Sequence, residues 1–385
     1  MSFIKKLFIF ILIIIFLVAF SNSYASLSIS NLVLFVAMGI DERDDGKLDV
    51  TFQFTSSSPV SSTGSTEKNN PLDFTITADS ISTAINLMNT YTGKEINLSH
   101  CKVIVFSEKI AYRGISNEIY TLMNNSQIRP STNIIISKST AKEYIQSSKA
   151  EFENLQTKYY EVFTNSSKYT GLSADATIGD FFNALVSPSE EPYAILGSIT
   201  PTNITGYSGT QNTGLAVFND AILVGELSPT ETLSFLAIKT LIDGFMITVP
   251  DPTDENSFID VYITPSKKTN IDPSIVNGSP LVDCFFSYSG KIHSLKSNAK
   301  YLDENVLNYI SDSCSIYLED IFKNFLYTSA KDLEVDILDI GKYSRKDFLS
   351  SSDFNNYDWS NKFKNSFFNV DVSVKVRSGF LLIET

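Results

Sequence analysis

The amino-acid sequence predicts an α+β protein of three domains, each built from a mainly antiparallel or mixed β-sheet packed with α-helices, after an N-terminal signal peptide. Apolar runs and apolar–polar alternations typical of strands are interleaved with segments of helical apolar spacing, without a strict strand–helix repeat. A stretch rich in Ser, Thr, Pro and Gly separates two such series at residues 187–214. A continuous apolar run at residues 7–20 precedes both series.

The N-terminal segment, residues 1–25, has the order of a signal peptide: two lysines, the apolar run, and then small and polar residues. The run is shorter than the roughly 20 apolar residues of a membrane-spanning helix. Small residues at Ser23 and Ala25 fit the cleavage rule, so we expect cleavage between Ala25 and Ser26 and export of the mature chain. No cysteine lies in or just after the run, so the chain has no thiol there for a lipid.

An N-terminal α+β domain is expected over residues 26–192. Asp79 or Ser80 caps the first of its helices, whose apolar residues recur at helical intervals. The expected strands are residues 32–40, 48–54, 73–77, 102–106 and 133–136, and the expected helices are residues 81–92, 116–124 and a mostly helical segment from 139 to 186.

A middle α+β domain is expected over residues 193–255. A strand is expected at residues 194–199, and residues 214–218 and 222–227 are expected to form a hairpin around an Asn-Asp turn. Ser228 and Glu231 are spaced as a capping box with a proline at the first helical position, so a helix is expected to begin there and to run to about residue 241.

A C-terminal α+β domain is expected over residues 256–385. Its strands are expected at residues 258–263, 282–288 and 370–376, and the last of these alternates valine with polar residues. A long helix is expected at residues 303–328. Its apolar stripe keeps the helical period throughout and consists of Val306, Ile310, Cys314, Tyr317, Ile321 and Phe325.

Composition excludes several classes of function. The chain has 43 acidic residues against 30 Lys and Arg, a formal net charge of −13, so it lacks the basic field that gathers nucleic-acid phosphates. With 2 His and 3 Cys, neither a site of several imidazole or thiolate ligands nor a disulfide framework is expected. The sequence therefore assigns no catalytic, cofactor-binding or metal-binding residue.

The few histidines and cysteines have structural interpretations. His100 and His293 are far apart in the sequence and are interpreted as two separate structural histidines, because a catalytic triad needs a nucleophile and an acid around one imidazole. Cys101, Cys284 and Cys314 are interpreted as small buried hydrophobic residues, with a bridge between Cys284 and Cys314 as the alternative.

Adjacent carboxylates provide the candidates for an enzyme. Glu190 with Glu191, or Glu319 with Asp320, are pairs of the kind that glycoside hydrolysis requires on either side of one bond. Neighbouring acids on a loop or on a solvated helix face usually have no such role. The favoured interpretation is that neither pair is catalytic.

Short segments along the whole mature chain form an ordered set. They are the export signal, residues 38–41, residues 98–108 with the following 114–115, residues 214–218 and 223–225, residues 336–341, Trp359 and the strand at 370–376. In this order and spacing they resemble the Ger(x)C family of spore germination proteins, the C subunits of nutrient germinant receptors in endospore-forming bacteria. Members of that family typically carry a lipidated Cys directly after the signal peptide, whereas this chain has residues 23–26 there, without a Cys.

The resemblance implies three α+β domains and a position on the outer face of the inner spore membrane, beside two integral membrane subunits of A and B type. It implies no enzymatic activity, and it provides no catalytic or germinant-binding residue. The expected function is that of a non-catalytic receptor subunit acting through protein–protein contacts at the membrane surface, without an N-terminal lipid. Two alternatives remain: an exported hydrolase of envelope polymers, and a secreted module that binds a small ligand.

Overall fold

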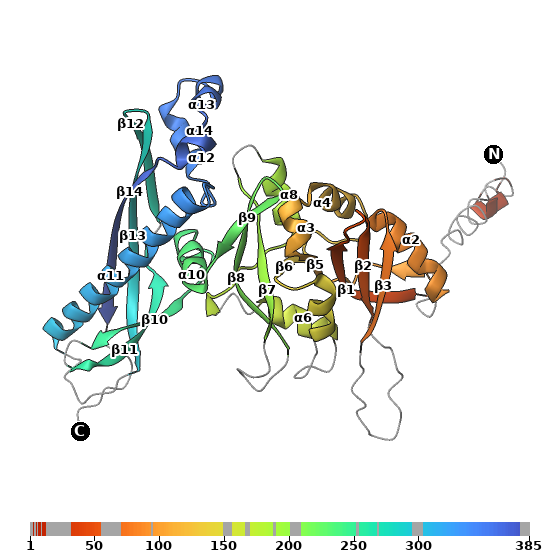
Figure 1. Cartoon of the computed structure of the whole chain (residues 1–385), viewed down its shortest axis with the longest axis horizontal. Helices are drawn as coiled ribbons and strands as arrows, with labels where there is room; N and C mark the ends of the chain where they lie inside the picture. The colour runs from red at the N-terminus through yellow and green to blue at the C-terminus, as the bar shows by residue number, and fades with distance from the viewer. Residues whose placement is uncertain are drawn as a thin grey trace, which may run out of the picture.

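The computed structural model describes residues 32–54, 71–93, 95–148, 156–165, 170–187, 190–200, 209–251, 254–267, 269–294 and 303–377, with a few positions between 3 and 12. Its strands form two sheets, one in each half of an elongated molecule, and the N-terminus lies at the end opposite the second sheet (Figure 1). Among the described helices, none is both long and apolar enough to cross a membrane. The expected cleavage site between Ala25 and Ser26 lies outside the described residues, so cleavage stays a prediction.

The first sheet is mixed and contains nine strands in the order β3-β2-β1-β5-β6-β7-β8-β9, with β4 paired to β1. Its inner strands run parallel and its outer strands antiparallel. The strands β5 and β6 read as continuous apolar runs because they are buried on both faces. The strands are β1 (Leu32–Glu42), β2 (Leu48–Phe54), β3 (Leu72–Ala78), β4 (Glu95–Asn97), β5 (Val103–Ser107), β6 (Asn133–Ser137), β7 (Tyr193–Thr200), β8 (Gly209–Asn219) and β9 (Ile222–Leu227).

Helices between the parallel strands pack on this sheet, as a crossover connection requires. They are α2 (Ile81–Thr92), α3 (Glu108–Arg113), α4 (Ser116–Met123), α5 (Ala141–Ser147), α6 (Gln156–Asn165) and α8 (Ile178–Val186). Ser80 caps α2, as expected, through its side chain to the Thr83 N–H. These strands and the main helices agree with those predicted from the sequence, except that the short elements β4 and α3 were not predicted.

The second sheet contains five strands, in the order β10-β11-β13-β12 with β14 paired to β13. Its strands are β10 (Phe245–Asp251), β11 (Asp254–Pro265), β12 (Asn270–Val276), β13 (Ser279–Ser294) and β14 (Phe367–Arg377). Its helical elements are α10 (Pro229–Ile238), α11 (Glu304–Tyr327), η2 (Thr328–Asp332), α12 (Ile340–Ser344), η3 (Arg345–Asp347), α13 (Ser351–Tyr357) and α14 (Trp359–Phe363). The capping box of Ser228 and Glu231 opens α10 as expected. The strands β10 and β12 were not expected.

The long helix α11 runs diagonally across one face of the second sheet (Figure 1). Ile310, Cys314 and Phe325 of its expected stripe are buried, whereas Tyr317 is exposed because Leu318 and Phe322 complete the stripe instead. Along β14 the alternating valines face this helix, and Val372, Val374 and Val376 are buried. The α+β class is confirmed in both halves.

The middle segment differs from the expected domain with its own sheet. Residues 193–255 are shared between the two sheets, because β7 pairs in parallel with the free edge of β6 and brings β8 and β9 into the first sheet. The rest of the segment, α10 and β10, joins the second core. On β8, Ala216 and Phe218 belong to the first core, whereas Leu215 and Val217 belong to the second. The strand β8 therefore contributes to the cores of both halves. The domain boundaries expected at residues 192 and 255 stay predictions.

Candidate functional site: the joint between the two halves

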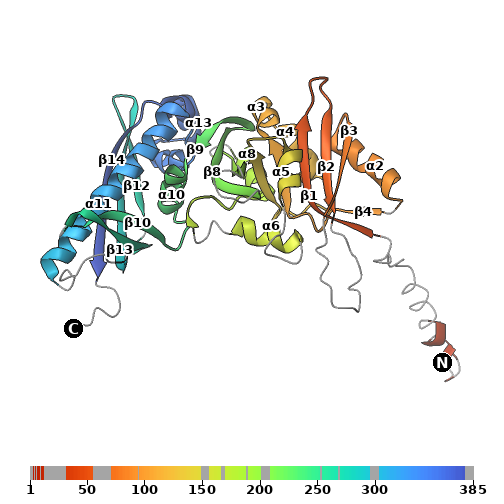
Figure 2. The same cartoon turned by 60° about the horizontal axis from the view of Figure 1, so that its bottom comes forward.

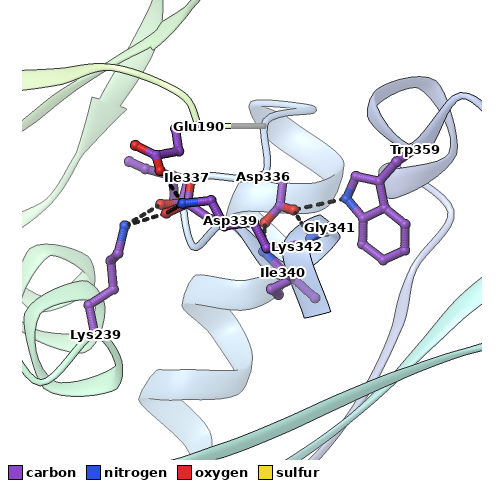
Figure 3. Close-up of polar contacts among 9 residues, drawn as sticks. All are labelled: Glu190, Lys239, Asp336, Ile337, Asp339, Ile340, Gly341, Lys342 and Trp359. Atoms are coloured by element: carbon purple, nitrogen blue, oxygen red, sulfur yellow. Dashed lines mark hydrogen bonds and ion pairs between the residues drawn. The ribbon is translucent and has the colours of Figure 1, made fainter. Parts of the chain in front are cut away.

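A polar cluster, which we call the joint, lies where the two halves meet. It consists of Glu190, Glu191, Lys239, the segment 333–342 and Trp359 (Figure 3). The segment follows the π-helical turn η2 at the end of α11 and passes next to the first sheet, where the side chain of Leu333 occupies the space that a Cβ on Gly225 of β9 would need. Gly225 therefore allows the C-terminal half to approach the edge of the first sheet.

Asp336 organises the segment. Its carboxylate accepts the backbone N–H groups of Ile340 at 2.9 Å and Gly341 at 2.7 Å, and the indole N–H of Trp359 at 2.8 Å. Burial of the carboxylate raises the pKa of Asp336 to about 6, although the three hydrogen bonds oppose this shift. The indole ring in turn lies so close to Gly341 that an added Cβ would be 2.7 Å from its Cδ1 atom. Asp336 thus ties the start of α12 to α14.

A chain of charges connects the segment to both neighbours. Lys239, at the end of α10, donates to the Asp339 carboxylate at 2.8 Å and to the Ile337 carbonyl at 3.5 Å. Lys342 lies 3.8 Å from the same carboxylate and forms an ion pair with Glu190, just before β7. Asp339 has a left-handed backbone, with φ of 58°, which turns its side chain between the two lysines. Partly buried alternating charges of this kind fix the relative position of the elements that carry them.

Glu191 lies on the other side of the joint. Its Oε2 accepts the N–H of Asp220 in the β8–β9 turn at 3.1 Å. Burial raises the pKa of Glu191 to about 7, and the negative charges of Asp220, Asp336 and Asp339 contribute to that rise. The joint therefore holds two carboxyl groups that ionise closer to neutrality than exposed acids do.

A similar device holds α5 within the first half. Asp41, at the end of β1, accepts the N–H groups of Ala141 at 2.8 Å and Lys142 at 3.0 Å, in the first turn of α5. The helix lies close to β1, because a Cβ on Gly39 would be 2.8 Å from the Ile145 Cδ1 atom. Burial raises the pKa of Asp41. We call this contact the α5 latch.

The members of the candidate carboxylate pairs make separate contacts. Glu190 and Glu191 are adjacent in sequence, but the first is paired with Lys342 and the second accepts a backbone N–H from Asp220. Glu319 and Asp320 lie on α11, half-buried and exposed respectively. In the part of the chain that the structure describes, no group of three or more His, Cys, Asp and Glu side chains is arranged to hold a metal ion.

The histidines and cysteines lie apart. His100 is exposed before β5 and His293 is exposed at the end of β13, in different sheets. All three cysteines are free and buried, and burial raises each thiol pKa to about 12. The interpretation as small core residues is confirmed, and the alternative bridge between Cys284 and Cys314 is not formed.

Comparison with known proteins decides the family. One family profile, described as the spore germination protein N-terminal domain, matches residues 26–199, and a second, described as spore germination B3/GerAC like, C-terminal, matches residues 213–379. The chain belongs to the Ger(x)C family of spore germination proteins. Its fold is similar to the crystal structure of the GerBC protein, with a TM-score of 0.55 and 16% identity over 88% of this chain and 96% of that chain. A comparison with curated proteins finds no match.

Several segments that carried the Ger(x)C resemblance meet in the structure. Residues 38–41 form the strand side of the α5 latch, whereas residues 223–225, 336–341 and Trp359 meet at the joint. No signal in the sequence connects these segments with one another, and Lys239 and Lys342 were not predicted as site residues. The only available signal was the repeated Asp of residues 336–341, which does not indicate what those carboxylates contact.

Proposed function

We propose that this chain is the non-catalytic C subunit of a nutrient germinant receptor. In this role it acts through protein–protein contacts beside the integral membrane subunits of A and B type, at the outer face of the inner spore membrane. Membership of the Ger(x)C family supports the proposal. The observation that carries it is that the segments of family resemblance form internal contacts, the α5 latch and the joint, which hold elements in position.

The chemistry of the joint also supports a role in contact and shape. It contains no cysteine, histidine or serine to act as a nucleophile, and its lysines are paired with Asp339 and Glu190. Nucleophilic and acid–base catalysis both need a group that is free to react with a substrate. The paired charges instead link the two halves, so that a partner that holds one half would also orient the other.

Export is part of the same proposal. The N-terminal family profile begins at residue 26, the first residue after the expected cleavage site. Intact-mass measurement of the native protein is expected to give a chain beginning at Ser26 without a lipid. A mass that includes Met1, or an acylated residue, would contradict this part of the proposal.

A deletion strain tests the receptor role directly. Spores lacking this chain are expected to lose the response to at least one nutrient germinant, and a copy of the wild-type gene is expected to restore it. A non-nutrient trigger provides the control, because its response should not depend on a nutrient receptor. Normal responses to every nutrient germinant, in a strain without a redundant homologue, would overturn the proposal.

A further inference from the structure

The second sheet has one face that no described element covers. Along β13 the residues alternate strictly: Val282, Cys284 and Phe286 are buried toward α11, whereas the residues between them point to the other face. That open face carries exposed apolar side chains from three strands, Met246, Tyr262 and Phe285. Figures 1 and 2 show this sheet at the end of the molecule opposite the N-terminus.

The edge of the second sheet beside the open face is closed to strand addition. The N–H groups of Val374 and Val376 on β14 each donate at 3.0 Å to a serine hydroxyl on α11, Ser315 and Ser311 respectively. These two hydroxyl groups take the place of the backbone acceptors that an added strand would offer to the edge of β14. A partner of this region would therefore pack on the face of β13 and β14 rather than extend their edge.

On the open face, acidic and basic residues of β13 and β14 lie on opposite sides of one central pair of residues, which we call the central row. Ser287 of β13 pairs with Ser373 of β14 at the centre. On β14, Asp371 precedes Ser373 by two residues and Lys375 follows it by two residues. On β13, Asp283 precedes Ser287 by four residues and Lys291 follows it by four. Arg377 of β14 pairs with Lys291. Along β13 and β14, the acidic residues therefore lie at one end of the face and the basic residues at the other. On the neighbouring strands, Asp272 of β12 is paired with Lys346, and Asp260 of β11 lies near the basic end.

This sign reversal is the pattern that a second copy of the same face would complement. A two-fold axis along the central row turns the strand direction around, so that residues at equal distances on opposite sides of the row face each other in the two copies. Asp371 then faces Lys375 of the other copy. Asp283, which accepts the Asn369 side-chain amide at 2.7 Å, lies opposite Lys291. The same two-fold rotation places Phe285 opposite the small side chain of Ser289 of the other copy. A different partner would not require this reversal about one row.

We propose that the open face of the second sheet is an interface between two copies of this chain. The sheets pack face to face at about 10 Å, with their strands antiparallel across a two-fold axis through Ser287 and Ser373. The small serines on the axis allow this approach. The apolar side chains provide affinity, and the charges determine the register. Within the described residues, Asp371, Lys375 and Arg377 form no ion pair, so their charges are available to the second copy.

Cross-linking across the axis tests the interface in the full chain. In the exported protein recovered from cells that express it, Ser373→Cys is expected to give a covalent dimer with a bismaleimide of about 10 Å reach, since the residue faces itself across the axis. Ser351→Cys, on the exposed start of α13, is the matched control and is expected to stay monomeric. The three native cysteines are buried, and the protein without an added cysteine gives the background. Equal cross-linking at both positions would overturn the proposal.

Charge exchange tests the register. Added to Ser373→Cys, either Asp371→Lys or Lys375→Asp is expected to reduce the dimer by about tenfold, because the axis repeats each like-charge contact. Carrying both changes in one chain restores opposite charges and is expected to restore the dimer. Two differently tagged single variants, expressed together, are expected to cross-link to each other but not to themselves.

The charge variants lie on an exposed face, so their melting temperatures are expected to match that of the parent protein. Dimers that form equally well in both single variants would show that the sheets do not meet in this register, and the proposal would fail. The test is independent of the receptor role, since it is made without the A- and B-type subunits.

Discussion

The α5 latch and the joint use the same local device in different settings. In each, a buried aspartate accepts two backbone N–H groups from the start of a helix: Asp41 holds α5, and Asp336 holds α12. The difference lies in what else each carboxylate contacts. Asp41 connects elements of one half, where Thr140 and Glu143 also form a capping box for α5, whereas Asp336 also binds Trp359 and supports the segment between the halves. The α5 latch has the additional support of this capping box, whereas the joint is completed by two lysines whose partners lie 100 and 152 residues away in the sequence.

The largest effect is expected at the joint. Asp336→Ala removes the acceptor of three donors and should lower the free energy of unfolding by about 3 kcal/mol, since each buried donor without a partner costs about 1 kcal/mol or more. Urea unfolding followed by Trp359 fluorescence measures the change. Asp336→Asn keeps one acceptor oxygen and should recover part of the loss. An Ala variant as stable as the wild type would show that Asp336 does not organise this segment.

A smaller loss is expected at the α5 latch. Asp41→Ala removes the acceptor of two N–H groups, but the capping box of Thr140 and Glu143 remains, so about 2 kcal/mol is expected. Hydrogen exchange provides the comparison: the amides of Ala141 and Lys142 should exchange faster in this variant. The amides of α12 should exchange faster only in the Asp336 variant. Equal acceleration at both sites in either variant would contradict two separate devices.

The two close-packed glycines give a further contrast. Gly341→Ala places a methyl group against the rigid indole of Trp359. On Gly39 the nearest atom to an added methyl group is the end of the flexible Ile145 side chain, with Ala141 of α5 next at 3.2 Å. We expect a loss of about 2 kcal/mol for the first and about 1 kcal/mol for the second, because overpacking costs more where the neighbour cannot move. Thermal unfolding of the two variants measures the difference. Equal losses would mean that the indole can shift.

Most of the secondary structure follows from local sequence signals, but the joint does not. The capping box at Ser228, the valine alternation of β14 and the stripe of α11 are each contained in one segment. Lys342 and Glu190, in contrast, are 152 residues apart. Nothing in either neighbourhood indicates the other.

The shared middle segment has the same origin. A hairpin signal predicts that β8 and β9 pair with each other, but it does not say which sheet they join. They join the first sheet because β7, which precedes them in the sequence, pairs in parallel with the free edge of β6. The same limit applies to the open face, where the sequence shows the alternation of β14 and only the pairing with β13 reveals the reversed charges.

The last effect is the pH dependence of the joint. Because the pKa of Glu191 is raised to about 7, above its ordinary value near 4.5, the folded protein binds a proton that the unfolded chain releases between these two values. The contribution of this group to stability is therefore fully present below about pH 4.5 and is lost as the pH rises through 7. Glu191→Gln should flatten the decline of Tm between pH 5 and pH 7.5, since the amide does not titrate. Glu190→Gln is the matched control: it breaks the ion pair with Lys342 but leaves the Glu191 carboxyl in place, so the decline should persist. A decline that survives in the Glu191 variant would assign the pH dependence to the other buried carboxyl groups, Asp336 at the joint and Asp41 at the α5 latch.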